Sequence, residues 1–235
     1  MEGLWTRWLL RTWVVLILLF LFIPILLIFL YAFNTSNIQS WPIPGLTLKW
    51  FSSTFDDADV RTSLGLSLQV GLIATALALM LGSFAAFAIH RMMWFGREVV
   101  SLMFILPLAL PGIITGISLK AFFSFDGVPL SLLTIVVGHT TFCIVVVYNN
   151  VLARLRRTRA MLAFALSFDE VIVTTFTAGA QNTLPLWIFG AIRLGQRLPE
   201  VNVVVSFVIL VTIIPVVIAA RLTGGGGAAR VPAAR

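Results

Sequence analysis

The chain has 235 residues, of which 60% are hydrophobic and only 11% are charged. A soluble domain carries about 25% charged residues because water must wet its surface, so this composition excludes an ordinary soluble domain and predicts an integral membrane protein. The net charge of +7 does not indicate a nucleic-acid partner, because the basic residues flank hydrophobic runs instead of gathering on one exposed domain.

Six hydrophobic runs are predicted to form transmembrane helices. A helix needs roughly 20 apolar residues to cross the hydrocarbon core of a bilayer, and it satisfies its own backbone hydrogen bonds there. The predicted spans cover residues 13–33, 66–90, 99–122, 131–152, 160–178 and 203–220. The expected fold class is therefore all-α, a polytopic membrane helix bundle of about six transmembrane helices. Residues 1–222 form one transmembrane domain, and the glycine-rich residues 223–235 are predicted to be a disordered cytoplasmic tail.

The distribution of basic residues predicts the orientation of these spans. Eleven of the 16 Lys and Arg residues fall on one side of the predicted bundle and five on the other. The five are Lys49, Arg61, Lys120, Arg193 and Arg197. Because cytoplasmic loops carry the excess of basic residues, both termini are predicted to be cytoplasmic.

The first two spans and the loop between them carry packing and turn signals. The loop of residues 34–65 contains Pro42 and Pro44, which forbid a regular helix at that point. The second span has small side chains along one face, where another helix can approach closely. They are Gly71, Thr75, Ala78, Gly82 and Ala86.

The third span contains Pro107 and Pro111, four residues apart. Each proline removes a backbone donor, so together they are predicted to bend or break the helix. In transporters, broken helices often line the substrate path near the midplane of the membrane. A packing kink whose backbone groups are satisfied by neighbouring helices is the alternative, and the proline spacing does not choose between the two.

The fourth span contains His139 and the single cysteine, Cys143. One cysteine and two separated histidines predict neither an internal disulfide nor a metal site, and Cys143 is expected to be a small buried hydrophobe. A lone intramembrane histidine is more often a hydrogen-bonded packing residue than a ligand. An intramembrane hydrolase would need a serine paired with a histidine base. Ser118 is present, but nothing in the sequence pairs it with His139, so no catalytic residue is predicted.

The fifth span contains two adjacent carboxylates, Asp169 and Glu170, near its middle. A carboxylate at that depth costs about 2.5–3.5 kcal/mol on insertion scales, so it normally faces a bundle interior or a water-filled cavity. On a continuous helix Glu170 shares a small, polar face with Ser167 and Thr174, whereas Asp169 lies about 100° away. Glu170 is therefore the better candidate for the substrate path, with Asp169 at its edge. Alternatively, the pair caps a helix or reaches the outer interface.

Three sequence segments resemble the permeases of spermidine/putrescine-type ABC importers. The segments are Leu106–Gly116, with the sequence LPLALPGIITG, then Gly138–Phe142 (GHTTF) and Leu166–Glu170 (LSFDE). The resemblance extends from about Trp13 to Arg221. It implies a membrane permease that imports small polycations by alternating access, together with a second permease subunit, a cytoplasmic ABC ATPase and an external substrate-binding protein. Ser167, Phe168, Asp169, Glu170 and Thr174 would then line the substrate path in a bacterial inner membrane.

The chain itself carries no ATP-binding signature. It has no G-x-x-x-x-G-K-[ST] loop, so ATP hydrolysis must come from a separate subunit, and no cofactor or enzymatic activity is expected here. Aromatic side chains such as Phe164, Phe168 and Phe176 could add cation–π contacts to a polycation.

One segment departs from the family pattern. These permeases have a cytoplasmic coupling segment with a Glu-Ala-Ala…Gly signature between the fourth and fifth helices, and this segment docks into the ATPase. Here residues 152–159 run straight into Ala160-Met161-Leu162, without that signature. The alternative function is therefore a decoupled or internally deleted permease paralogue that acts as a non-transporting membrane partner. The arginines of residues 154–159 could instead contact anionic lipid headgroups.

Overall fold

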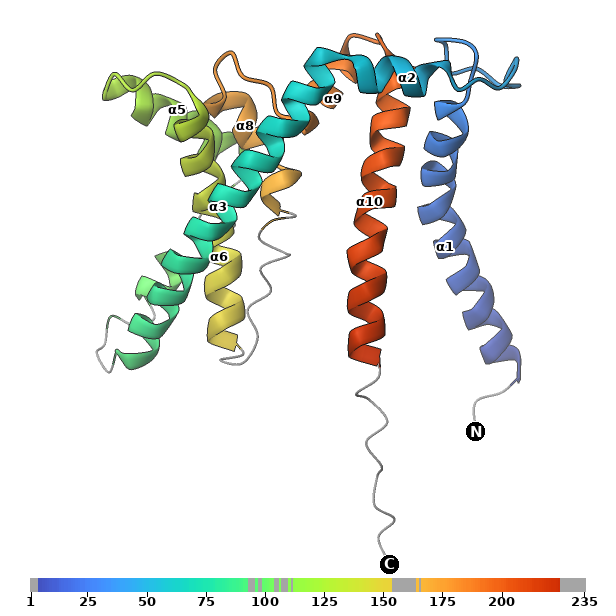
Figure 1. Cartoon of the computed structure of the whole chain (residues 1–235). Helices are drawn as coiled ribbons and strands as arrows, with labels where there is room; N and C mark the ends of the chain where they lie inside the picture. The colour runs from blue at the N-terminus through green and yellow to red at the C-terminus, as the bar shows by residue number, and fades with distance from the viewer. Residues whose placement is uncertain are drawn as a thin grey trace, which may run out of the picture. The chain divides into compact units, whose positions relative to one another are not determined.

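A computed structural model of the chain describes residues 4–92, 96, 99–103, 106, 110, 112–153, 164 and 166–224 (Figure 1). Their regular secondary structure is helical, apart from one isolated β-bridge between Asn34 and Leu46. The chain divides into two compact units. We call Asp57–Gly190 the central unit, and we call Met1–Asp56 together with Ala191–Arg235 the terminal unit.

The terminal unit is built on two long helices, α1 (Leu4–Ala32) and α10 (Leu198–Gly224). They pack against each other and lie side by side in Figure 1. The short helix α2 (Lys49–Asp56) packs on α10, where the rings of Phe55 and Phe207 meet edge to face at 5.4 Å. Most apolar side chains of α1 stay exposed within the chain, as expected for a helix that faces lipid or a partner subunit.

The loop between α1 and α2 is held in a defined shape by hydrogen bonds. The amide of Thr35 donates to the carbonyl of Gly45, and the amide of Thr47 donates to the carbonyl of Phe33. The indole Nε1 of Trp50 donates to the carbonyl of Asn34 at 2.7 Å. Pro42 and Pro44, which were predicted to prevent a helix in this loop, lie between Thr35 and Gly45 in the sequence. Their backbone is not helical.

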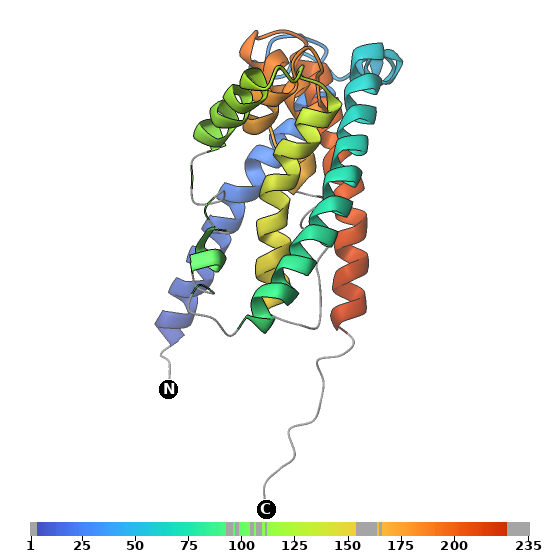
Figure 2. The ribbon, with the colours of Figure 1, turned by 90° about the vertical axis from the view of Figure 1, so that its left-hand side faces the viewer.

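The central unit contains α3 (Ala58–Arg91), α5 (Gly112–Phe125), α6 (Leu132–Ala153) and α8 (Ile172–Thr177), and α9 (Leu184–Arg193) begins in it. The longest contact is between α3 and α6, which run side by side in Figures 1 and 2. Helix α8 lies against both α5 and α6. Backbone amide Leu184 at the start of α9 donates to Ser67 Oγ of α3 at 2.6 Å.

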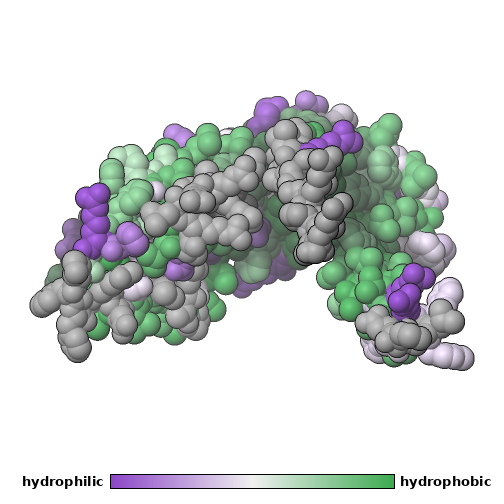
Figure 3. Space-filling view, turned by 90° about the horizontal axis from the view of Figure 1, so that it is seen from below, coloured by the Kyte–Doolittle hydropathy of each residue, from purple (hydrophilic) through white to green (hydrophobic). Residues whose placement is uncertain are grey.

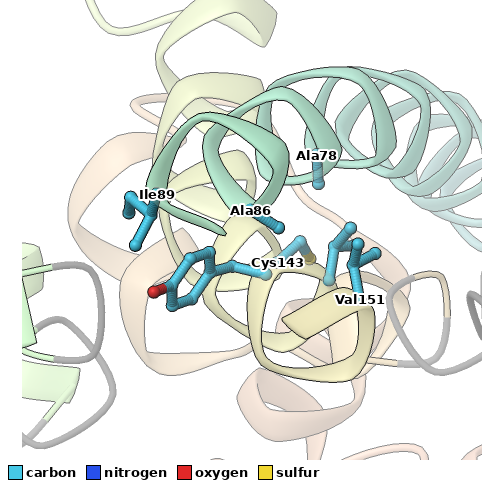
Figure 4. Close-up of a cluster of buried hydrophobic side chains, with 7 residues drawn as sticks. Ala78, Ala86, Ile89, Cys143 and Val151 are labelled. Carbon is cyan, nitrogen blue, oxygen red and sulfur yellow. The ribbon is translucent and has the colours of Figure 1, made fainter. Parts of the chain in front are cut away.

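Small residues hold α3 and α6 together, as the sequence predicted. All five positions of the predicted small face are buried. A Cβ added at Gly82 would lie 2.9 Å from Val147 Cβ and 3.0 Å from the carbonyl oxygen of Ile144, so the two backbones are nearly in contact. Around this point Ala78, Ala86 and Ile89 pack against Cys143, Tyr148 and Val151 (Figure 4). Cys143 is a small buried hydrophobe, as expected.

Several helix boundaries differ from the sequence prediction, and α1 and α10 also begin earlier than predicted, at Leu4 and Leu198. Helix α3 starts eight residues before the predicted Leu66, because the Asp57 carboxylate caps it by accepting from the amides of Asp59 and Val60. The short helices α2 and α9 were not predicted. Helix α10 continues to Gly224, and residues 225–235 of the predicted tail lie outside the described residues.

The helices agree with a polytopic membrane protein. Three of them are long and apolar enough to cross a bilayer, over Trp5–Ala32, Ala58–Arg91 and Leu132–Leu152. Shorter apolar helices cover Gly112–Phe125, Leu184–Arg193 and Leu198–Ile214. Hydrophobic side chains occupy much of the face seen in Figure 3, whereas hydrophilic ones form small separate groups.

Candidate functional site

The fifth hydrophobic run is interrupted at its acidic pair. Residues 166–168 are helical, Asp169 lies in a turn, and Glu170 and Val171 lie outside any helix before α8 begins at Ile172. The prediction of one continuous helix over residues 160–178 is therefore wrong. The local polar side chains explain the break, since they offer the backbone other hydrogen-bond partners. The amide of Val173 is bound by Glu170 Oε1 at 3.0 Å.

Helix α8 is held between α5 and α6 by glycines. A Cβ added at Gly116 of α5 would lie 2.6 Å from the Phe176 ring, and one added at Gly138 of α6 would lie 2.9 Å from Val173 Cγ1. Gly112, the first residue of α5, lies opposite Ile172, the first residue of α8. The end of the proline-containing segment of the third run and the break in the fifth run therefore meet. Such paired discontinuities are typical of transporter binding sites.

His139 connects the two sides of the break to α6. Its Nδ1 lies 2.9 Å from Ser167 Oγ, before the break, and its Nε2 lies 2.6 Å from Thr174 Oγ1, after it. Thr174 Oγ1 also donates to the carbonyl oxygen of Glu170 at 2.6 Å. The side chains of His139, Ser167 and Thr174 are buried. The prediction that His139 is a hydrogen-bonded packing residue is confirmed, and its partners lie on both sides of the acidic pair.

A second contact fixes the other end of α8. Thr134 Oγ1 of α6 donates to the carbonyl oxygen of Thr177 at 2.7 Å. Both side chains are fully buried. The short α8 is therefore attached to α6 by hydrogen bonds at Thr174 and Thr177, and among described residues 166–177 those at 169–171 lie outside the helices.

The break lies beside the first half of α6. His139 is the eighth of the 22 residues of α6, so at 1.5 Å per residue it lies about 10 Å from the start of a helix about 33 Å long. If α6 spans the bilayer, the break lies within the hydrocarbon core, where a carboxylate without a functional or structural partner is costly.

The predicted site residues have different surroundings. Asp169 is exposed within this chain, and Glu170 and Phe168 are partly buried, whereas Ser167 and Thr174 are buried against His139. The rings of Phe168 and Phe164 stack at 5.9 Å. Phe164 also packs on Gly71 of α3. Pro107 and Pro111 lie outside the described residues, and around them Leu106 is helical and Leu110 lies in a bend.

Among the described residues there is no group of three or more His, Cys, Asp or Glu side chains that could hold a metal ion. The chemistry that the break offers is therefore that of single groups. The Glu170 carboxylate supplies a negative charge, and the exposed Asp169 carboxylate supplies a second one next to it. The backbone carbonyls of Glu170 and Val171 accept from the Thr174 hydroxyl and the Thr175 amide. The two carboxylates suit a positively charged partner.

Comparison with known proteins shows that the chain is similar to transport proteins. No protein-family model matches the chain. It is 28% identical to the putrescine transport system permease protein PotI of Escherichia coli strain K12, over 84% of this chain and 85% of that protein. It is 27% identical to the spermidine/putrescine transport system permease protein PotC of the same strain, over 84% and 87%. Identity to PotC of Haemophilus influenzae is 26%, over 87% and 92%.

The chain is a homologue of these permease proteins. This confirms the resemblance stated from the three sequence segments. It also confirms the prediction of a membrane transport subunit in place of an enzyme, since the matched proteins are permease components of transport systems.

This chain is shorter than its two E. coli relatives inside the aligned region. The alignment with PotI of E. coli spans 243 positions, whereas 84% of 235 residues is about 197 residues of this chain, which leaves about 46 positions without a counterpart. The same arithmetic for PotC of that strain, with 233 positions and 84%, leaves about 36. The predicted loss of a coupling segment concerns residues 152–162, and residues 154–163 lie outside the described residues, so that loss stays a prediction.

The role of His139 as a connector was missed at the sequence level. The sequence indicated a lone intramembrane histidine and, separately, an acidic pair with nearby hydroxyl side chains. Ser167 and Thr174 are seven residues apart, so two turns of one helix would place them on the same face. That spacing, matched to one buried histidine on another helix, is the signal that could have joined the two motifs.

Proposed function

We propose that the chain is the transmembrane permease subunit of a bacterial inner-membrane ABC importer for small polycations of the putrescine and spermidine type. The observation that carries the substrate class is the homology to PotI and PotC, whose names specify these polyamines. We further propose six membrane spans with both termini in the cytoplasm. Five of the six predicted spans contain an apolar helix of the structure, the three long ones and those over Gly112–Phe125 and Leu198–Ile214, which supports most of this number. The excess of basic residues on one side supports the orientation.

The site of cation recognition in this proposal is the break at residues 169–171. A di- or trication that leaves water needs fixed negative partners, because the membrane interior supplies none. Two unit charges 4 Å apart attract by about 4 kcal/mol at an effective dielectric constant of 20. Glu170 is the principal partner because its side chain is partly buried at the break, whereas that of Asp169 is exposed. Asp169 is at the edge of the path, and Phe168 offers an aromatic face to the cation.

The importer needs further subunits in this proposal. The chain has no ATP-binding loop, so a cytoplasmic ABC ATPase drives transport. A second permease subunit completes the substrate path, and an external substrate-binding protein delivers the polyamine. The homologous proteins are named as components of transport systems, which supports assembly with other subunits.

Exchange of one carboxylate tests the substrate site. The variant Glu170→Gln keeps the size of the side chain and removes its charge. With the chromosomal copy replaced in the source bacterium, we expect uptake of radiolabelled putrescine and spermidine to fall at least tenfold, with the same amount of protein in the membrane. Asp126→Asn is the matched control, because Asp126 is an exposed carboxylate in the turn after α5. Unchanged uptake by Glu170→Gln would remove Glu170 from the site.

A second candidate function is favoured by one observation. The roughly 36 to 46 aligned positions that the relatives have and this chain lacks support an internally deleted permease that acts as a non-transporting membrane partner. A pull-down of the tagged chain from detergent-solubilised membranes separates the two functions. Recovery of an ABC ATPase supports the importer, whereas recovery of a second permease without an ATPase supports the non-transporting partner.

A further inference from the structure

His139 is a buried polar side chain whose two ring nitrogens contact residues on opposite sides of the break. Ser167 precedes Asp169 and Glu170, and Thr174 follows them. The backbone between these two contacts is not helical at Glu170 and Val171, and Glu170 is bound to α8 through the Val173 amide and the Thr174 hydroxyl. The histidine contacts connect α8 to the helical residues before the break.

The hydrogen bonds of Thr174 determine where the imidazole proton lies. A threonine hydroxyl has one hydrogen to donate. The carbonyl oxygen of Glu170, 2.6 Å away, can only accept, so it receives that hydrogen. Thr174 Oγ1 must then accept from His139, which places a proton on Nε2. In a neutral ring Nδ1 has no proton and accepts from the hydroxyl of Ser167. A neutral ring is favoured because a charge at this depth is costly.

The result is a directed chain of hydrogen bonds that ends on the backbone of the acidic pair. Ser167 donates to His139, His139 donates to Thr174, and Thr174 donates to the carbonyl of Glu170. In this series of hydrogen bonds, the role of each group as donor or acceptor follows from the role of the group that it contacts. A rotation of the imidazole ring by 180° would break both of its hydrogen bonds. Gly138, next to His139, lets α8 approach α6 closely enough for these bonds, since a Cβ there would lie 2.9 Å from Val173.

We propose that His139, neutral and protonated on Nε2, is a positioning residue that holds the two sides of the break together and thereby sets where the Glu170 carboxylate meets a substrate ammonium group. This proposal rests on the proposed function of Glu170. It adds to that function a residue that does not touch the substrate and acts through Thr174 and the Glu170 backbone. Loss of the His139 bonds leaves Glu170 bound to α8 but removes the connection between α8 and Ser167, so the position of the carboxylate relative to the segment before the break has to be ordered when the substrate binds.

Nitrogen-15 NMR of the purified full chain tests the protonation state without any transport measurement. The chain has only two histidines, and the exposed His90 can be replaced by glutamine to leave His139 alone. We expect one protonated nitrogen, Nε2, and one unprotonated nitrogen, Nδ1, at neutral pH. Thr174→Val should shift mainly the Nε2 resonance, and Ser167→Ala should shift mainly that of Nδ1. A proton on Nδ1 alone, or on both nitrogens, would overturn the proposal.

Polyamine uptake in the source bacterium tests the positioning role. We expect His139→Leu to raise the KM for putrescine about tenfold with a maximal rate within about twofold of wild type. His139→Gln, whose amide can both donate and accept, should recover most of the affinity. The double variant with Ser167→Ala should be no worse than His139→Leu alone, because His139→Leu already removes the bond that Ser167→Ala removes.

The two readouts separate failure of this proposal from failure of the proposed function. A fall in maximal rate and in membrane protein without a change in KM would make His139 a packing residue only and would overturn the positioning role. If Glu170→Gln leaves uptake unchanged, the proposed site fails, and the NMR result still decides whether His139 holds the break in the predicted tautomer.

Discussion

The α3–α6 pair and the α5–α8 pair of the central unit are both held at close range by glycines, but their interfaces differ in polarity and continuity. Between α3 and α6 the buried cluster is Ala78, Ala86, Ile89, Cys143, Val147, Tyr148 and Val151, and both helices are continuous there. Around α8 the buried side chains include Ser167, Thr174, Thr177 and His139, and the run is interrupted.

The difference indicates a division of roles. Long apolar helices in close contact gain packing along their whole length, and they have no free backbone groups between their ends. A six-residue helix next to a break has few backbone hydrogen bonds of its own and depends on side chains to hold it. We therefore expect α3 and α6 to be the rigid part of the central unit and the break to be the part that responds to a substrate.

The largest effect on stability is expected at the α3–α6 contact. Gly82→Ala forces a Cβ to within about 3 Å of Val147 and the Ile144 carbonyl, and backbone cannot yield cheaply. We expect a loss of about 1–3 kcal/mol, read as a lower unfolding temperature in detergent. Gly65→Ala on the same helix is the control. Nothing lies within 4 Å of a Cβ there, so this variant should be neutral or slightly more stable. Equal effects of the two changes would contradict the close contact.

A smaller effect is expected at the α5–α8 contact, where the neighbour is a side chain. Gly116→Ala places a Cβ 2.6 Å from the Phe176 ring, and the ring can rotate in part. We expect a loss of about 1–2 kcal/mol together with reduced putrescine uptake. The double variant Gly116→Ala, Phe176→Leu should recover part of the stability and part of the uptake, because leucine is smaller and leaves room for the added Cβ. Absence of rescue would show that Gly116 is needed for another reason.

A hydrogen bond between Tyr148 and Ser101 connects α6 to the third hydrophobic run, and its removal measures how much this connection stabilises the protein. Tyr148 Oη donates to Ser101 Oγ at 2.8 Å. Tyr148→Phe keeps the ring and removes the donor, so we expect a loss of about 1 kcal/mol in unfolding free energy. Ser101→Ala should have a similar effect, and the double variant should equal either single one. Additive losses would indicate that the two hydroxyls have separate partners.

The smallest effect on stability is expected at Asp169. Its side chain is exposed within this chain, so Asp169→Asn should change the unfolding free energy by less than about 0.5 kcal/mol. Its effect on polyamine uptake should be weaker than that of Glu170→Gln, because Asp169 lies at the edge of the proposed path. A stronger loss of uptake with Asp169→Asn would reverse the assignment of the two carboxylates.

Part of the candidate site could be read from the residues themselves. The acidic pair marked the fifth run as functional because carboxylates are rare and costly in an apolar segment. The small face of the second span predicted its buried side correctly, from Gly71 through Ala86. The predicted continuity of the fifth span was wrong. Hydropathy averages over the run, so it cannot detect that the amide of Val173 donates to the Glu170 carboxylate instead of to a helical carbonyl.

The sequence by itself determined the class of protein, the main hydrophobic helices and the relationship to polyamine permeases, because these depend on composition, on apolar run length and on local motifs. Only the tertiary structure decided that the break in the fifth run meets the start of α5 at Gly112 and that His139 joins Ser167 to Thr174. Those contacts link residues 28 to 60 positions apart. Hydrogen bonds and close packing over such separations depend on how helices are placed, and no local pattern specifies that.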